Sequence, residues 1–212
     1  MTAKYTLPPG FSFRPEYFNR SAQADLIASV EAAIASVPFW RPTMPRTGQP
    51  MSVMLSNFGP LGWVSDQRGG YRYQSVHPET GNRWPQIPEA LLDLWECVAD
   101  YPEPPEACLI NWYADDSRMG MHIDWDEEAT DAAVVSVSLG AKARFRIGGP
   151  NRGGKTGSLV LSSGDVVVLG GEARRCYHGV DRIYPGTSTL LPAHSFPGGG
   201  RINLTMRRVT LP

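Results

Sequence analysis

The second half of the chain constrains the fold most strongly, because turn-forming residues divide it into short β-rich segments. From Cys108 onward, the runs CLINWY, AVVSVSL, ARFRI, GSLVL, DVVVL and RINLTMR are separated by glycine, proline or aspartate. Short runs rich in β-branched and aromatic residues, bounded in this way, are typical of strands. Six such runs predict a mainly β protein whose core is an antiparallel sandwich or barrel.

Two amphipathic helices and a hairpin are predicted before these strands. The first helix is expected from Ser21, as its N-cap, to Val37, and the second from about Pro88, because apolar residues recur there at helical spacing. Between them, LGWVSDQRGGYRYQ is typical of a hairpin with a Gly69-Gly70 turn. We therefore expect one α+β domain over residues 1–212, with helices and hairpin in 1–106 and the strand core in 107–212.

Composition excludes several classes of protein. The formal net charge is -1, so the chain is not a generally basic nucleic-acid binder, although residues 132–164 hold basic but no acidic side chains. No apolar run approaches the roughly 20 residues that span a bilayer, and the N-terminus lacks the apolar centre of a secretory signal. The 3 cysteines are scattered, which argues against a disulfide framework and favours the reducing cytoplasm.

The segment MHIDWDEE places a histidine and a carboxylate two residues apart, followed by further acids. Alternate side chains of a strand share a face, so His122 and Asp124 would project together. The best third ligand is His178, in CYHGV, because the other two histidines lie in proline-rich loops and are expected at the surface. Two histidines and one carboxylate form the facial triad of non-haem Fe(II) oxygenases, and zinc would accept the same ligands.

The last strand, RINLTMR, places four polar side chains on one face, namely Arg201, Asn203, Thr205 and Arg207. Two arginines that point into a barrel are costly unless an opposite charge meets them. A dianionic ligand supplies that charge, because arginine grips a carboxylate through two parallel hydrogen bonds. Together with an open-sided iron triad, this strand suggests 2-oxoglutarate as co-substrate.

An ordered set of motifs now resembles the AlkB family of Fe(II)/2-oxoglutarate-dependent dioxygenases, and its bacterial DNA-repair branch in particular. The motifs are MSVMLSNFGPLGW, ETGNRWPQIP, ACLINWY, MHIDWDEE, VVSVSLG, SGDVVVLGGEARRCYHG and RINLTMR. They extend from about Met51 to Arg208, which is most of the chain. The resemblance implies a double-stranded β-helix (jelly-roll) core with N-terminal helices and a nucleotide-recognition lid.

The resemblance also implies a role for each matched residue. Iron would be bound by His122, Asp124 and His178, and 2-oxoglutarate would be contacted by Asn111, Tyr113, Arg201, Asn203, Thr205 and Arg207, with the two arginines on its carboxylates. The hairpin residues Trp63, Tyr71, Arg72 and Tyr73 fall on the family's lid, and Asp126 and Arg152 fall where it lines the damaged base. Lid anchoring for Trp63 and support of the iron ligands for Asp126 are the alternatives.

The implied function is oxidative demethylation of N-alkylated bases such as 1-methyladenine and 3-methylcytosine. It consumes O2 and 2-oxoglutarate and releases formaldehyde, succinate and CO2. The expected partner is alkylated DNA, preferably single-stranded, with RNA as the second polymer, and the expected protein is a cytoplasmic monomer without membrane contact. Two alternatives remain open: a 2-oxoglutarate oxygenase acting on a protein or small molecule, and a non-catalytic metal-binding barrel of cupin type.

Overall fold

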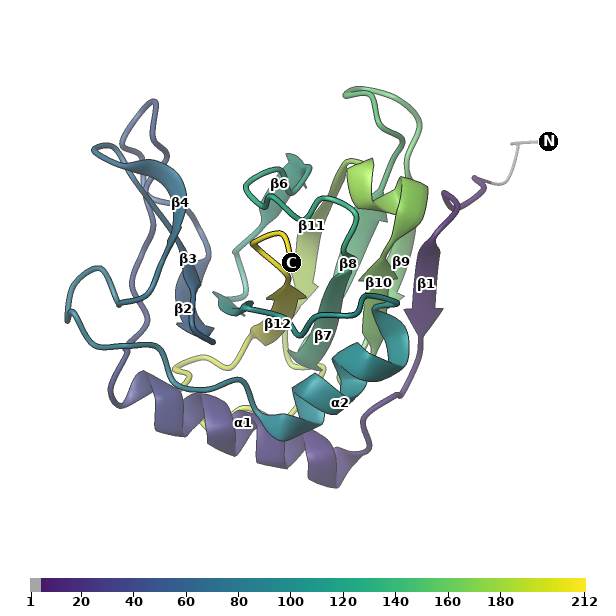
Figure 1. Ribbon diagram of the computed structural model, residues 1–212. Helices are drawn as coiled ribbons and strands as arrows, with labels where there is room; N and C mark the ends of the chain where they lie inside the picture. Colours follow the sequence, from purple (N-terminus) through teal and green to yellow (C-terminus); the bar gives the residue numbers. More distant parts are fainter. Residues whose placement is uncertain (1–4) are drawn as a thin grey trace.

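The computed structural model describes residues 5–212, and its framework is two antiparallel sheets that share a core (Figure 1). The larger sheet has the order β1-β10-β7-β12-β5-β2, formed by β1 (Phe11–Arg14), β2 (Met54–Phe58), β5 (Ala107–Tyr113), β7 (Val134–Gly140), β10 (Val166–Leu169) and β12 (Arg201–Arg207). The smaller sheet has the order β6-β11-β8-β9, formed by β6 (Met119–His122), β8 (Lys142–Ile147), β9 (Gly157–Leu161) and β11 (His178–Tyr184).

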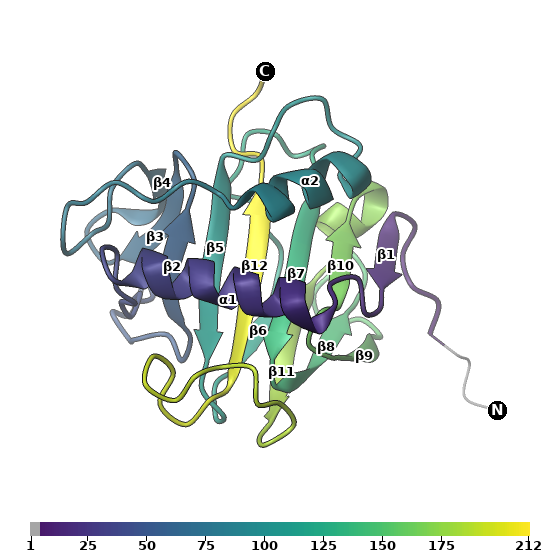
Figure 2. The ribbon, with the colours of Figure 1, turned by 90° about the horizontal axis from the view of Figure 1, so that it is seen from below.

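Two helices, α1 (Arg20–Ile34) and α2 (Glu89–Val98), cover the outer face of the larger sheet (Figure 2). The N-cap of helix α1 lies two residues earlier than predicted, because the Asn19 side chain, and not Ser21, accepts the capping hydrogen bond from the Ala22 amide (3.0 Å). Its apolar stripe, which includes Val30, packs into a core with the sheet. Within residues 5–212, neither helix is long and apolar enough to cross a membrane.

Strand β12 divides the core into an apolar and a polar side. Ile202, Leu204 and Met206 pack in the apolar core between the larger sheet and the helices. The polar side chains that alternate with them line the cavity on the other face of the sheet. The predicted alternation of RINLTMR is therefore confirmed. A second apolar cluster, which includes Phe145 of β8 and Val167 of β10, joins the two sheets next to this polar face.

All six predicted strands are present, and the structure adds further strands that sequence patterns missed. Strands β1 and β6 have 4 residues each, too few to establish an alternation. Strand β11 carries an irregularity between Val180 and Arg182 that interrupts its period. Because β1 and β2 complete the larger sheet, the predicted boundary at residue 107 runs through one continuous sheet.

The predicted hairpin forms a separate two-stranded sheet of β3 (Gly62–Asp66) and β4 (Gly70–Gln74). It stands beyond β2, at the opposite end of the molecule from β1 (Figure 1). A short 3₁₀ helix, η1 (Gly171–Arg175), connects β10 to β11. The surface position predicted for His77 is wrong, because its ring is buried between Trp40 and Trp84 and lies 2.8 Å from the Pro38 carbonyl.

Candidate active site

Three predicted metal ligands meet where β6 ends and β11 begins. His122 and His178 lie opposite one another in the strand register, and Asp124 follows β6 in the next loop. The Nε2 atoms of His122 and His178 lie 3.6 and 3.5 Å from the two oxygens of Asp124. One ligand atom from each residue lies within 4.8 Å of the others. This spacing allows a single cation to contact all three side chains.

Hydrogen bonds leave the correct nitrogen of each histidine free for a metal. The Nδ1–H groups of His122 and His178 donate to the carbonyls of Gly120 (2.8 Å) and Cys176 (3.1 Å). A carbonyl only accepts, so Nδ1 holds the proton and the Nε2 lone pair points at the site. Burial and the neighbouring His178 lower the pKa of His122, which favours its neutral, metal-binding form.

Asp124 completes a donor set that fits Fe(II). It is 6% exposed, and its Oδ2 atom has no hydrogen-bond partner among the described residues. Burial alone would raise the pKa of Asp124, but the Arg207 guanidinium holds it well below its usual value. An ionised carboxylate with an unsatisfied buried oxygen, beside two imidazole Nε2 atoms that face it, is a donor set that fits a divalent cation.

The two arginines of β12 differ in what they already contact. Arg207 Nη2 donates to Asp124 (2.7 Å), and its Nη1 donates to Glu127 (2.8 Å). Arg201, only 1% exposed, donates from Nη2 to Ser138 (2.9 Å), whereas its Nε and Nη1 atoms have no partner in the described chain. Burial lowers the pKa of Arg201. A buried guanidinium that has no carboxylate partner within residues 5–212 fits a ligand carboxylate, so Arg201 is the freer of the two to bind 2-oxoglutarate.

One cavity of about 730 Å³ joins this region to the hairpin. It is lined by every predicted metal and co-substrate residue, namely Asn111, Tyr113, His122, Asp124, His178, Arg201, Asn203, Thr205 and Arg207. Asn203 donates to Ser136 (2.7 Å) and accepts from Thr205 (2.9 Å), which fixes the orientation of its amide. The structure therefore brings together residues that are scattered over the second half of the sequence.

The opposite wall of the cavity is aromatic. The rings of Trp63 and Tyr71 stack with centroids 5.5 Å apart, and Trp63 Nε1 donates to Asp126 (2.7 Å). Both aromatic side chains line the cavity, as do Asp126 and Arg152, whose guanidinium lies over the Tyr177 ring. A flat apolar surface therefore faces the metal ligands across the cavity.

Comparison with known proteins decides the family. Residues 10–207 match the family model of the 2OG-Fe(II) oxygenase superfamily. The alpha-ketoglutarate-dependent dioxygenase AlkB homolog of Caulobacter vibrioides is 52% identical over 96% of this chain and 89% of its own length. AlkB of Escherichia coli is 38% identical over 90% and 87%.

The chain belongs to the AlkB family. Its fold agrees, because the solved structure of OsALKBH1 superimposes with a TM-score of 0.76 at 29% identity, covering 96% of this chain and 100% of that one. This AlkB-family protein is an Fe(II)/2-oxoglutarate-dependent dioxygenase that uses O2, with a jelly-roll core. The zinc and cupin-type alternatives are therefore not favoured.

Two predicted lid residues of this AlkB-family enzyme lie away from the cavity. Arg72 points to the other face of the hairpin, where it pairs with Asp66 (2.9 Å). Tyr73 shares the face of Tyr71, but its hydroxyl contacts Glu127 and Arg207 in the interior. Trp63 and Tyr71 line the cavity, whereas Arg72 and Tyr73, on the same hairpin, are not among its lining residues.

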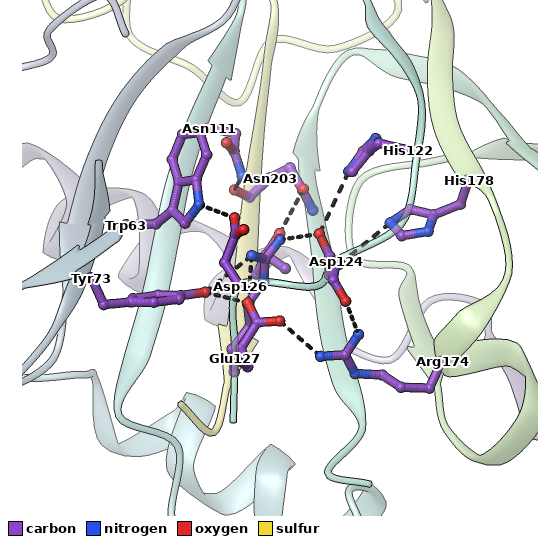
Figure 3. A network of polar contacts seen from close by, with 12 residues as sticks. Trp63, Tyr73, Asn111, His122, Asp124, Asp126, Glu127, Arg174, His178 and Asn203 are labelled. Atoms are coloured by element: carbon purple, nitrogen blue, oxygen red, sulfur yellow. Dashed lines mark hydrogen bonds and ion pairs between the residues drawn. The ribbon is translucent and has the colours of Figure 1, made fainter. Parts of the chain in front are cut away.

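Sequence reasoning missed a buried ionic network behind the AlkB-family site (Figure 3). At its centre, the Glu127 side chain is 0% exposed and accepts from Tyr73, Arg207 and Arg174, whose Nη2 lies at 2.9 Å. Arg174, on η1, also donates to the Asp124 carbonyl (2.7 Å). Burial would raise the pKa of Glu127, but Arg207 and Arg174 bring it below its usual value. The only sequence signal was the acidic run, which also fits a solvated loop.

Proposed function

We propose that this dioxygenase removes N-linked methyl groups from bases such as 1-methyladenine and 3-methylcytosine in DNA, with RNA as the second polymer. The observation that carries the proposal is the Trp63–Asp126 pair on the wall of the cavity that also holds the three metal-ligand side chains. An aromatic ring beside a carboxylate suits a flat cation, and methylation at these ring nitrogens makes the base cationic. The motif resemblance to the bacterial DNA-repair branch supports the same substrate.

The protein's part in the reaction is to hold and orient the reactants. Bound Fe(II) supplies oxidation by O2, which converts 2-oxoglutarate to succinate and CO2 and the N-methyl group to N-hydroxymethyl. His122, Asp124 and His178 would hold the metal, and Arg201 would bind a carboxylate of 2-oxoglutarate. The hydroxymethyl group then leaves the base as formaldehyde, and the ring nitrogen returns to its unmodified form. Asp124 and His178 lie on a buried part of the cavity wall, which limits the access of water to these steps.

Recognition requires the base to leave its stack, because the metal ligands lie inside the cavity. Trp63 and Tyr71 offer it an aromatic surface, while Arg152, an exposed residue of the cavity lining, offers a positive charge to the backbone. Extruding an unpaired base costs less than opening a base pair, so single strands should be preferred. In this proposal the β3–β4 hairpin acts as the nucleotide-recognition lid.

The test is formaldehyde release from matched oligonucleotides that carry 1-methyladenine or 3-methylcytosine. Single-stranded DNA, duplex DNA and RNA are compared, with Asp124→Ala as the inactive control. We expect release that requires Fe(II) and 2-oxoglutarate and is fastest on single strands. Succinate formation without formaldehyde from any oligonucleotide would instead support an oxygenase of proteins or small molecules.

We also propose a cytoplasmic monomer that acts without a membrane partner. Cys97, Cys108 and Cys176 are all free thiols, as expected in a reducing compartment. Light scattering of the purified protein, alone and with an oligonucleotide, should give the mass of one chain, 23.3 kDa, before nucleic acid is added. A dimer mass at micromolar concentration would contradict this part of the proposal.

A further inference from the structure

Exposed apolar side chains gather at the mouth of the active-site cavity. Met44, Tyr71 and Trp125 are 41%, 46% and 57% exposed, and all three line the cavity. Single exposed apolar residues need no explanation, but a cluster on the rim of a cavity usually marks a binding surface. Trp125 is the most exposed of the three.

The position of Trp125 is fixed although its ring is not packed. Its neighbour Asp124 is buried and ion-paired, and its neighbour Asp126 accepts the hydrogen bond from Trp63. The backbone of Trp125 is therefore held on both sides. Within residues 5–212, the indole forms no ring pair and no hydrogen bond, and Trp125 is 57% exposed, so most of its surface is open to a ligand.

The surroundings of Trp125 indicate the chemistry of its ligand. Four of the 7 methionines, Met44, Met51, Met119 and Met121, line the same cavity, and methionine adapts to flat apolar groups of varied shape. Two exposed lining residues, Arg118 and Arg152, are cationic and suit phosphates. An aromatic face between adaptable apolar groups and arginines matches a nucleotide better than a peptide.

We propose that Trp125 is the stacking platform for the base next to the alkylated one. This inference rests on the proposed function, in which the alkylated base enters the cavity beyond Trp125. The neighbouring base would lie at the mouth and stack on the indole. In a duplex that base is already paired and stacked, so the platform favours a flexible single strand of at least two nucleotides.

The platform is tested with two substrates that carry the same methylated base, one with neighbouring nucleotides and one without. Wild type, Trp125→Ala and Trp125→Phe are assayed for kcat/KM on a methylated single-stranded oligonucleotide and on the matching methylated mononucleotide. Trp125→Ala should lose about fivefold or more on the oligonucleotide, the lower range for one stacking aromatic, and nothing on the mononucleotide. Trp125→Phe should recover most of the loss because it keeps a π-face.

A binding measurement separates this inference from the proposed function. Fluorescence anisotropy of a labelled single-stranded oligonucleotide with metal-free protein needs no turnover, and Leu211→Ala, also a highly exposed apolar residue but outside the cavity lining, is the control. Trp125→Ala should weaken binding about fivefold and Leu211→Ala should not.

The outcomes divide as follows. Equal losses on oligonucleotide and mononucleotide would make Trp125 a support of Asp124 and overturn the platform. Equal losses of affinity for single-stranded and duplex DNA would overturn it too, as would unchanged oligonucleotide binding in Trp125→Ala. Wild-type protein that binds oligonucleotide through Trp125 but releases no formaldehyde would leave the platform intact and reject the demethylase function.

Discussion

The two walls of the active-site cavity are built in opposite ways. The wall that carries the metal ligands, the metal wall, is buried and held by ion pairs. Arg207 pairs with both Asp124 and Glu127, and Arg174 pairs with Glu127. The hairpin wall is half-exposed and belongs to a separate two-stranded sheet. Its side chains reach the core loop through the hydrogen bonds Trp63–Asp126 and Tyr73–Glu127. The difference suggests a reaction centre fixed before substrate arrives and a recognition surface that adapts to it.

The largest effect is expected from removing a metal ligand on the metal wall. Asp124→Ala should reduce Fe(II)-dependent succinate formation to background, because it removes one of three protein ligands and leaves too few for the metal. Metal affinity of the purified protein, measured by calorimetry with Co(II) as a stable substitute, should fall in parallel. Full activity of this variant loaded with Fe(II) would reject the metal site.

The buried network supplies the next largest effect. Glu127→Ala leaves Arg174 and Arg207 without their shared carboxylate, and breaking a buried ion pair in this way costs about 3–5 kcal/mol. The free energy of unfolding in urea, measured on metal-free protein, is the readout. The adjacent, exposed Glu128→Ala is the matched control and should change it by less than about 0.5 kcal/mol. Similar small losses in both variants would show that the metal wall is less rigid than its contacts imply.

The two arginines of β12 sharpen the comparison within the metal wall. Arg201→Lys should raise the KM for 2-oxoglutarate about 10- to 100-fold, because hydrogen bonds to charged groups contribute about 1.5–3 kcal/mol and an ammonium lacks the planar grip. It should leave stability nearly unchanged, since Arg201 pairs with no protein carboxylate within residues 5–212.

Arg207→Lys tests whether the second arginine of β12 supports the fold as well as co-substrate binding. It should raise the same KM and also lower the unfolding free energy, because Arg207 holds two buried acids. Steady-state kinetics and urea denaturation of both variants separate the two roles. The same pair of changes in both variants would mean that the arginines are equivalent.

The sequence predicted those parts of the two walls whose residues lie close together along the chain. The alternation in RINLTMR gave one face of the site, because strand periodicity is a local property. The His122–Asp124 pair was found from its spacing, but strand β6 ends at His122, so Asp124 reaches the site from the following loop and not from a shared strand face. The acidic run could not tell that Glu127 would be buried while Glu128 and Asp126 stayed exposed, since that depends on Arg174, which lies 47 residues away. The contact between Tyr73 and Glu127 could not be read from the sequence for a similar reason, because the two residues lie 54 positions apart.

The smallest effect concerns what Asp126, the core-loop residue that accepts from Trp63 of the hairpin wall, recognises. Asp126→Asn keeps an acceptor for the Trp63 indole but removes the charge, so it leaves the aromatic wall in place. At an exposed site one charge pair contributes about 1 kcal/mol, so kcat/KM on the cationic lesions 1-methyladenine and 3-methylcytosine should fall about fivefold. The neutral lesion 1-methylguanine should be unaffected, because it offers no charge to the carboxylate.

Two variants keep this measurement specific. Trp63→Phe retains a ring and loses the indole N–H, so it should weaken cationic and neutral lesions by similar factors. Because Trp63 and Asp126 are hydrogen-bonded, the double variant should lose less than the product of the single losses. Equal losses on both lesion classes in Asp126→Asn would make Asp126 a support for Trp63. Lesion choice would then rest on the shape of the cavity, and the hairpin wall would contribute surface without reading charge.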